Sequence, residues 1–106
     1  MDYFFIGDEE LVTAFRFIGI KGEAVNDPGE AAAAFKDVTE GNNENASGCK
    51  ILIITEDTAD ALGDLAVDWQ LSGSYPLLVE IPGISGRQED RKTLVDAIRE
   101  AIGIHV

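Results

Sequence analysis

The feature that most constrains this chain is an alternation, repeated four times in 106 residues, of a short run typical of a strand with an amphipathic segment. These runs lie at 3–6, 21–25, 50–55 and 77–81; three of them are apolar, whereas 21–25 is more polar, as an edge strand would be. Strands that alternate with helices favour a parallel sheet with right-handed crossovers and helices on both faces. The sequence therefore predicts an α/β fold. We expect a three-layer, four-stranded parallel sheet in the order 2-1-3-4, Rossmann-like or receiver-like, followed by a C-terminal helix.

Local signals place the helices between these strands. Asp8, and Asn26-Asp27-Pro28, are typical of helix starts, where a side chain caps free backbone N–H groups and proline suits the first turn. The first helix is expected to present Leu11, Ala14, Phe15 and Ile18, and the second Ala31, Ala34, Phe35 and Val38. A single third helix is predicted from about 58 to 70, weakened slightly by Gly63, and a last helix from about 89 to 102.

Charge and composition exclude several classes of protein. Residues 1–86 contain 16 acidic and 4 basic residues, whereas residues 87–106 contain 4 of each. An acidic body repels phosphate backbones and anionic lipids, so we expect neither nucleic-acid binding nor direct membrane insertion. The single Cys49 and the start of the chain, which does not resemble a signal peptide, predict a cytoplasmic protein.

One edge of the predicted sheet collects polar residues. Ligands of such sheets usually bind where the strand order reverses, which here would bring together Gly7, Asp8, Thr55, Glu56 and Asp57. This acidic crevice could hold Mg²⁺ and accept a phosphoryl group, as in receiver-like signalling domains. However, strand three ends in Thr55 rather than aspartate, and no lysine follows strand four, where Ile81-Pro82-Gly83 stands. Helix capping by Asp8 and Asp57 accounts for these residues equally well.

The remaining reactive residues form no constellation. The chain has no phosphate-binding loop of the G-x-x-x-x-G-K-[ST] type. Cys49 would need a base, and the only histidine is His105, which also has no second metal ligand nearby. We therefore predict a half-buried Cys49 thiol, no catalytic residue, no cofactor and no metal site.

Several segments together resemble the F subunit of V-type and archaeal-type (A-type) ATP synthases. Their order and spacing match the family over most of the chain, although each alone is weak. They are Ile6-Gly7-Asp8-Glu9, Phe15-Arg16-Phe17-Ile18-Gly19-Ile20, Asn26-Asp27-Pro28, Ile51-Leu52-Ile53-Ile54-Thr55-Glu56, residues 76–83 and Ile98-Arg99-Glu100-Ala101-Ile102-Gly103.

This resemblance implies a function within a rotary machine. It implies a central-stalk subunit without an active site, which binds the coiled-coil D subunit and couples ion transport to ATP synthesis or hydrolysis. Neighbouring partners would be the A and B subunits of the catalytic head and the membrane-ring adaptor subunit. The protein would then be peripheral to the membrane on its cytoplasmic side. The receiver-like signalling domain with an acidic crevice is the alternative.

The resemblance also divides the chain. Residues 1–83 are expected to form the globular body, and residues 84–106 a hinge and a C-terminal helix that modulates the machine. The apolar stripe of that helix could pack either against the protein's own sheet or against a partner helix. The candidate interface residues are Arg87, Arg91, Leu94, Val95, Ile98, Arg99 and Ile102.

Overall fold

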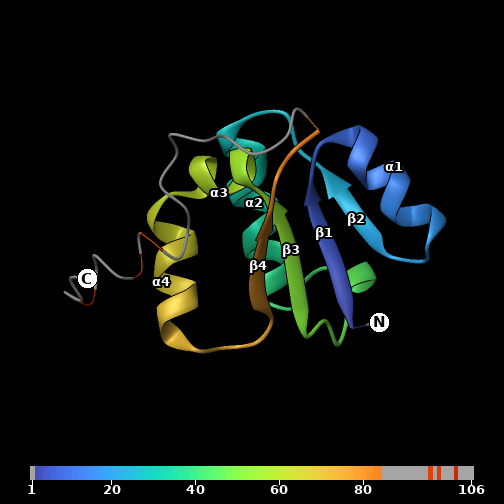
Figure 1. Cartoon of the computed structure of the whole chain (residues 1–106). Coiled ribbons are helices and arrows are strands. Elements are labelled where there is room, and N and C mark those ends of the chain that lie inside the picture. Colours follow the sequence, from blue (N-terminus) through green and yellow to red (C-terminus); the bar gives the residue numbers. More distant parts are fainter. Residues whose placement is uncertain (1, 85–95, 97, 99–101, 103–106) are drawn as a thin grey trace.

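The computed structural model describes residues 2–84 together with residues 96, 98 and 102 (Figure 1). Most of the predicted last helix therefore lies outside the described residues. The elements are, in order, β1 (Tyr3–Gly7), α1 (Glu9–Phe17), β2 (Lys21–Ala24), α2 (Pro28–Thr39), the 3₁₀ turn η1 (Glu44–Ala46), β3 (Ile51–Thr55), α3 (Glu56–Leu62), α4 (Asp64–Ser72) and β4 (Leu77–Ile81).

The four strands form one parallel sheet in the order β2-β1-β3-β4. Phe5 pairs with Gly22 of β2 on one side and with Ile53 of β3 on the other, and Ile53 in turn pairs with Val79 of β4. The predicted fold class and strand order are confirmed.

One face of the sheet carries the main core. Helices α2, α3 and α4 lie on this side, away from α1 (Figure 1). Every second strand residue points into this layer, and α2 contributes the predicted apolar side chains. The core residues are Phe4, Ile6, Leu52, Ile54 and Leu78 from the strands, Ala31, Ala34, Phe35, Val38, Ala59, Leu62 and Ala66 from the helices, and Ala46 from η1.

On the opposite face, α1 packs against β1 and β2. The ring of Phe15 lies 4.6 Å, centroid to centroid, from that of the fully buried Phe5, and Val12 is also buried. The predicted stripe is wrong for Ala14 and Ile18, which are exposed. A short helix that rests on two strands buries only a narrow stripe, so residues at the margins of an apolar pattern stay in solvent.

The predicted third helix is two helices, α3 and α4, divided at Gly63. Gly63 adopts φ 55° and ψ −124°, a conformation essentially confined to glycine. The Gly63 N–H still bonds to the carbonyl of Ala59, which closes α3, and the Gly63 carbonyl accepts from the N–H of Ala66 in α4. The apolar spacing continues across the break, and periodicity alone therefore did not reveal it.

A reciprocal cap fixes the start of α2. The Asp27 carboxylate accepts the N–H of Glu30 at 2.8 Å, and the Glu30 carboxylate accepts the N–H of Asn26 at 2.7 Å. Pro28 occupies the first turn, where its missing N–H removes no helical bond. Asp8 also occupies an N-cap position, that of α1, but its side chain makes no capping hydrogen bond.

Replacing Gly63 with alanine should destabilise the protein by about 1–3 kcal/mol, because the new side chain strains the backbone conformation. Gly73→Ala is the matched control, since Gly73 has an ordinary left-handed conformation (φ 69°, ψ 13°) that alanine adopts at about 1–2 kcal/mol. Steric contact does not distinguish the two sites, because a methyl group at Gly63 would meet only the Asp60 carbonyl at 4.0 Å and at Gly73 nothing. Urea unfolding measures the free energy of unfolding of both variants. If Gly63→Ala lowers it no more than Gly73→Ala does, the strained backbone conformation at Gly63 is contradicted.

Asp27→Ala should lower the free energy of unfolding by about 1 kcal/mol through loss of the N-cap bond. Asp8→Ala removes the same side chain from the other aspartate N-cap, where no side-chain bond is lost, so its effect should be smaller. Thermal and urea unfolding of the two variants, at one pH and salt concentration, test whether Asp27→Ala destabilises the protein more than Asp8→Ala. The reverse order would show that Asp8 carries a structural bond.

Candidate functional site

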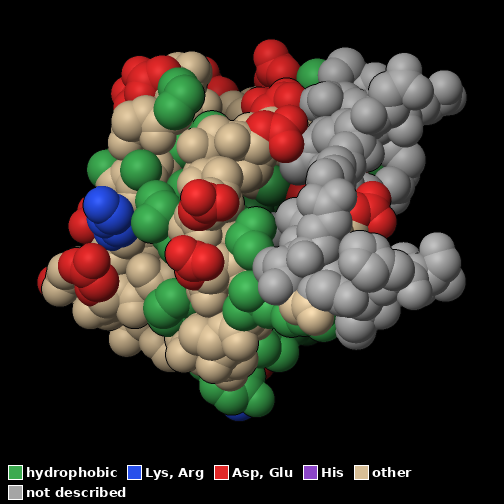
Figure 2. Space-filling view, turned by 90° about the vertical axis from the view of Figure 1, so that its left-hand side faces the viewer, with side chains coloured by type: hydrophobic (Ala, Val, Ile, Leu, Met, Phe, Trp, Pro, Cys, Tyr) green, Lys and Arg blue, Asp and Glu red, His purple; other side chains and the backbone are tan. Residues whose placement is uncertain are grey.

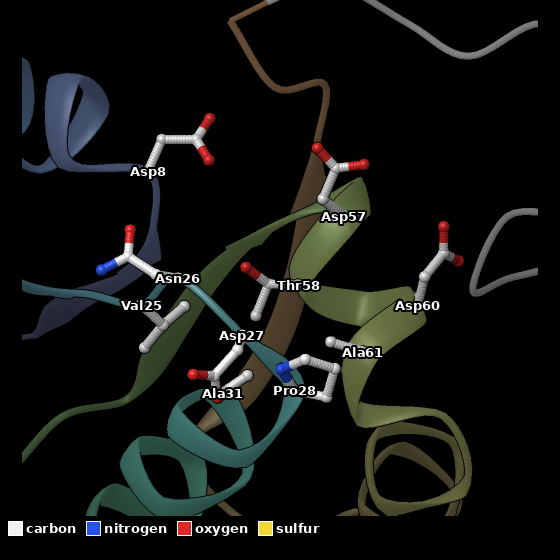
Figure 3. A pocket seen from close by; sticks show the side chains of 10 residues that line it. All are labelled: Asp8, Val25, Asn26, Asp27, Pro28, Ala31, Asp57, Thr58, Asp60 and Ala61. Carbon is white, nitrogen blue, oxygen red and sulfur yellow. The ribbon is translucent and has the colours of Figure 1, made fainter.

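A crevice of about 490 Å³ opens at the carboxyl ends of the strands (Figure 3). It lies where sequence reasoning placed a candidate site, between the ends of β1 and β3. The start of α2 also enters it, because β2 neighbours β1 and ends at the same edge. The lining residues are Asp8, Val25, Asn26, Asp27, Pro28, Ala31, Asp57, Thr58, Asp60 and Ala61.

Two carboxylates face each other across the mouth of this crevice. Asp8 comes from the β1–α1 junction and Asp57 from the first turn of α3 (Figure 3). A methyl group at Gly83 would lie 3.7 Å from Asp8 Oδ2 and 3.8 Å from Asp57 Oδ2. The strand order predicted that Asp8 and Asp57 lie near each other; that both also lie close to the backbone just after β4 was not predicted.

The other predicted members of this group have structural positions. Thr55 is fully buried and is the N-cap of α3, where its hydroxyl oxygen accepts the N–H of Thr58 at 3.2 Å and its hydroxyl donates to that of Thr58 at 2.9 Å. The prediction that Asp57 caps this helix is wrong, since Thr55 does so. Glu56 is 2% exposed and is not among the lining residues. Gly7 is confined by Phe5, whose ring would lie 2.5 Å from an added methyl group.

This arrangement does not fit a phospho-acceptor site. The residue at the end of β3 is a buried threonine engaged as a helix cap. Within residues 2–84 and the three described tail residues, no group of three or more histidine, cysteine, aspartate or glutamate side chains is arranged to hold a metal ion. Asp8, Asp27 and Asp57 instead stand near the N-termini of α1, α2 and α3, where the helix dipole favours negative charge.

Sequence reasoning missed that Asn26, Asp27 and Pro28 line the crevice. It considered only the ends of strands one and three. The signal was present, because the predicted order 2-1-3-4 puts the end of strand two at the same edge of the sheet. A capping sequence at that end therefore had to border the crevice.

A second hollow, of about 410 Å³, lies between α2 and α4. Its apolar part contains Phe35, Leu65 and Trp69; the Trp69 ring stands edge-on to Phe35, with the centroids 6.1 Å apart. Trp69 Nε1 donates to the carbonyl of Pro76 at 2.7 Å, so this side chain anchors the segment that leads into β4. On the α4 side of the molecule, acidic side chains are scattered among apolar ones (Figure 2). The hollow is thus accounted for by packing.

The predicted interface residues fall mainly in the undescribed tail. Arg87, Arg91, Leu94, Val95 and Arg99 lie outside the described residues. Ile98 is partly buried and packs against the core, whereas Ile102 is 52% exposed. The N–H of Ile102 donates to the carbonyl of Ile98 at 3.1 Å.

Cys49 is half-buried, as predicted. Burial raises the pKa of its thiol above the ordinary value, and the thiol donates to the carbonyl of Ile51 at 3.1 Å. A raised pKa keeps the thiol protonated at neutral pH, which opposes a nucleophilic role.

The helices of the described part of the chain include none with both the length and the apolar content to cross a bilayer.

Comparison with known proteins identifies the family. Residues 4–102 match the family described as ATP synthase (F/14-kDa) subunit. The chain is 30% identical to the F subunit of the A-type ATP synthase of Methanothermobacter thermautotrophicus, over 95% of this chain and 92% of that protein. It is 34% identical to the protein of the same name from Methanocaldococcus jannaschii, over 93% and 92% of the two chains. The relative from Methanosphaera stadtmanae is 28% identical over 99% and 95%. A match that spans all four strands and reaches residue 102 shows that the chain belongs to the ATP synthase (F/14-kDa) subunit family.

Proposed function

We propose that this protein is the non-catalytic F subunit of the central stalk of an A-type ATP synthase, and that it binds the coiled-coil D subunit. In this role it couples ion transport across the membrane to ATP synthesis or hydrolysis. The observation that carries the proposal is the family match over residues 4–102. Relatives named as F subunits of A-type ATP synthases, whose lengths this chain nearly equals, support it.

The chemistry of the described residues supports a binding role rather than a catalytic one. Three of the carboxylates of the crevice, Asp8, Asp27 and Asp57, stand at helix N-termini, and the Cys49 thiol is held protonated. The chain as a whole has a net charge of −12. Such a charge speeds encounter with a basic partner and repels nucleic acid and anionic lipid. A cytoplasmic location, peripheral to the membrane, fits these properties.

We divide the protein into a body, residues 1–83, and a tail, residues 84–106. The body docks on the stalk, and the tail modulates the machine. The candidate contacts of the tail are Arg87, Arg91, Leu94, Val95, Ile98, Arg99 and Ile102, and the catalytic head of A and B subunits and the membrane-ring adaptor are the further neighbours. The hinge would lie at Pro82-Gly83-Ile84-Ser85-Gly86.

Co-expression with the D subunit from the same organism should yield a stable 1:1 complex. Size-exclusion chromatography with light scattering measures its stoichiometry, and a net charge of −12 predicts faster association at low salt than at high salt. If the two folded proteins elute separately at low salt, the proposed function is wrong.

Deleting residues 87–106 should leave the complex with the D subunit intact but change the ATPase rate of the assembled enzyme. Circular dichroism of the shortened chain is the control, because Ile98 packs against the core and its loss removes apolar contacts. A shortened chain that is unfolded, or that no longer binds, would contradict the division into a docking body and a modulating tail.

A further inference from the structure

The face of the sheet that carries α1 is only partly covered. Tyr3 is 43% exposed, and Leu77 and Val79 of β4 are each 42% exposed. Ile51 and Ile53 of β3, which lie between these strands, are only partly buried. We call these five residues, Tyr3, Ile51, Ile53, Leu77 and Val79, the open sheet face.

Strand register makes these residues one surface. Tyr3 pairs with Ile51, and Ile51 with Leu77, so these three form a row across the sheet. Ile53 pairs with Val79 in the next row on the same face, and on its other side with Phe5, which α1 covers through Phe15. The open sheet face therefore begins where the cover of α1 ends and extends to β4 at the edge of the sheet.

The dimensions suit one helix. Strands are about 4.8 Å apart, so the uncovered strands together with the margin of β1 span about 10–14 Å, close to the 10–12 Å diameter of an α-helix. Five strand residues extend about 17 Å, the length of roughly 11 helical residues. Parallel sheets of this class normally carry helices on both faces, and the open sheet face is the position beside α1.

Other occupants fit less well. Ile98 of the tail packs against the core cluster, whose strand residues point to the opposite face of the sheet. A second copy of this chain would carry the same net charge of −12, and this like charge opposes association of two copies. Addition of a strand at β4 is hindered, because the N–H of Leu78 already donates to Gln70 Oε1 at 3.3 Å.

We propose that the open sheet face is the docking surface for one helix of an elongated, basic helical partner, and that this helix packs beside α1. The proposal rests on the proposed function and deepens it, since it assigns the docking surface for the coiled-coil D subunit. The partner helix presents apolar residues at i, i+3 or i+4 and i+7 to Ile51, Leu77 and Val79. Lysine and arginine flank this stripe, because residues 1–86 supply 16 acidic and 4 basic side chains.

The double substitution Leu77→Lys/Val79→Lys in the full-length chain should weaken binding to the D subunit at least tenfold, because it places two charges on the apolar open sheet face. Leu71→Lys on α4 is the matched control. Leu71 is 44% exposed, nearly the same as Leu77, but lies on the helix-covered side of the sheet. Biolayer interferometry with the D subunit immobilised measures the dissociation constants, and circular dichroism with thermal unfolding checks that each variant is folded.

A photo-crosslinking amino acid at position 79, and separately at position 71, gives a second measurement that needs no charged substitution. Crosslinks from position 79, but not from position 71, to the D subunit support the proposal. Crosslinks from position 79 to the protein's own tail, or to a second copy, overturn it. Equal loss of binding for the Leu71 and the Leu77/Val79 variants also overturns it. If the unmodified protein binds the D subunit and the double variant binds equally well, only this inference fails; if the unmodified protein does not bind, the proposed function fails with it.

Discussion

The structure depends on how a four-stranded parallel sheet is covered. Strands of this kind bury side chains on both faces, and every strand of this sheet except the edge strand β2 is predominantly apolar. Helices α2, α3 and α4 cover one face and enclose Phe4, Leu52 and Ile54 completely, or almost so. On the other face, among the described elements, α1 packs mainly against β1 and β2. The position of the core and the exposure of β3 and β4 both follow from this unequal cover.

The same topology explains why the crevice is acidic. All four parallel strands end at one edge, and the helices that follow the first three begin there. Each of these helix starts has free N–H groups and a positive dipole end, which acidic and hydroxyl side chains stabilise. Asp27 and Thr55 cap by hydrogen bonds, whereas Asp8 and Asp57 contribute charge at the helix starts. Clustering of carboxylates at this edge is thus a consequence of helix stability.

The sequence was most informative where a local signal acts alone. Three apolar runs and one more polar run predicted the four strands, and Asn26-Asp27-Pro28 predicted the start of α2, because capping and strand formation depend on neighbouring residues. The sequence was misleading where tertiary contacts determine the helix boundaries and the burial of side chains. Gly63 looked like a mild weakness in one helix but divides two, and Ala14 and Ile18 belong to an apolar stripe yet face solvent. In the crevice, Asp8 and Asp57 were placed correctly. The burial of Glu56 was missed, because spacing does not show which way the first turn of a helix faces.

An exposed apolar sheet face is usually a hazard, because it adjoins an edge strand that can pair with another chain. In this protein the edge strand β4 is restrained by side chains of α4, whereas the open sheet face is exposed. Gln70 of α4 accepts a hydrogen bond from the N–H of Leu78, and Trp69 Nε1 donates to the carbonyl of Pro76 just before β4. These two contacts from α4 restrain β4, the edge strand. The open sheet face is itself apolar or aromatic in the row that runs from Tyr3 through Ile51 to Leu77, and Tyr3 and Leu77 are exposed. A sheet whose edge N–H is already bonded while its face stays exposed favours helix docking over strand pairing.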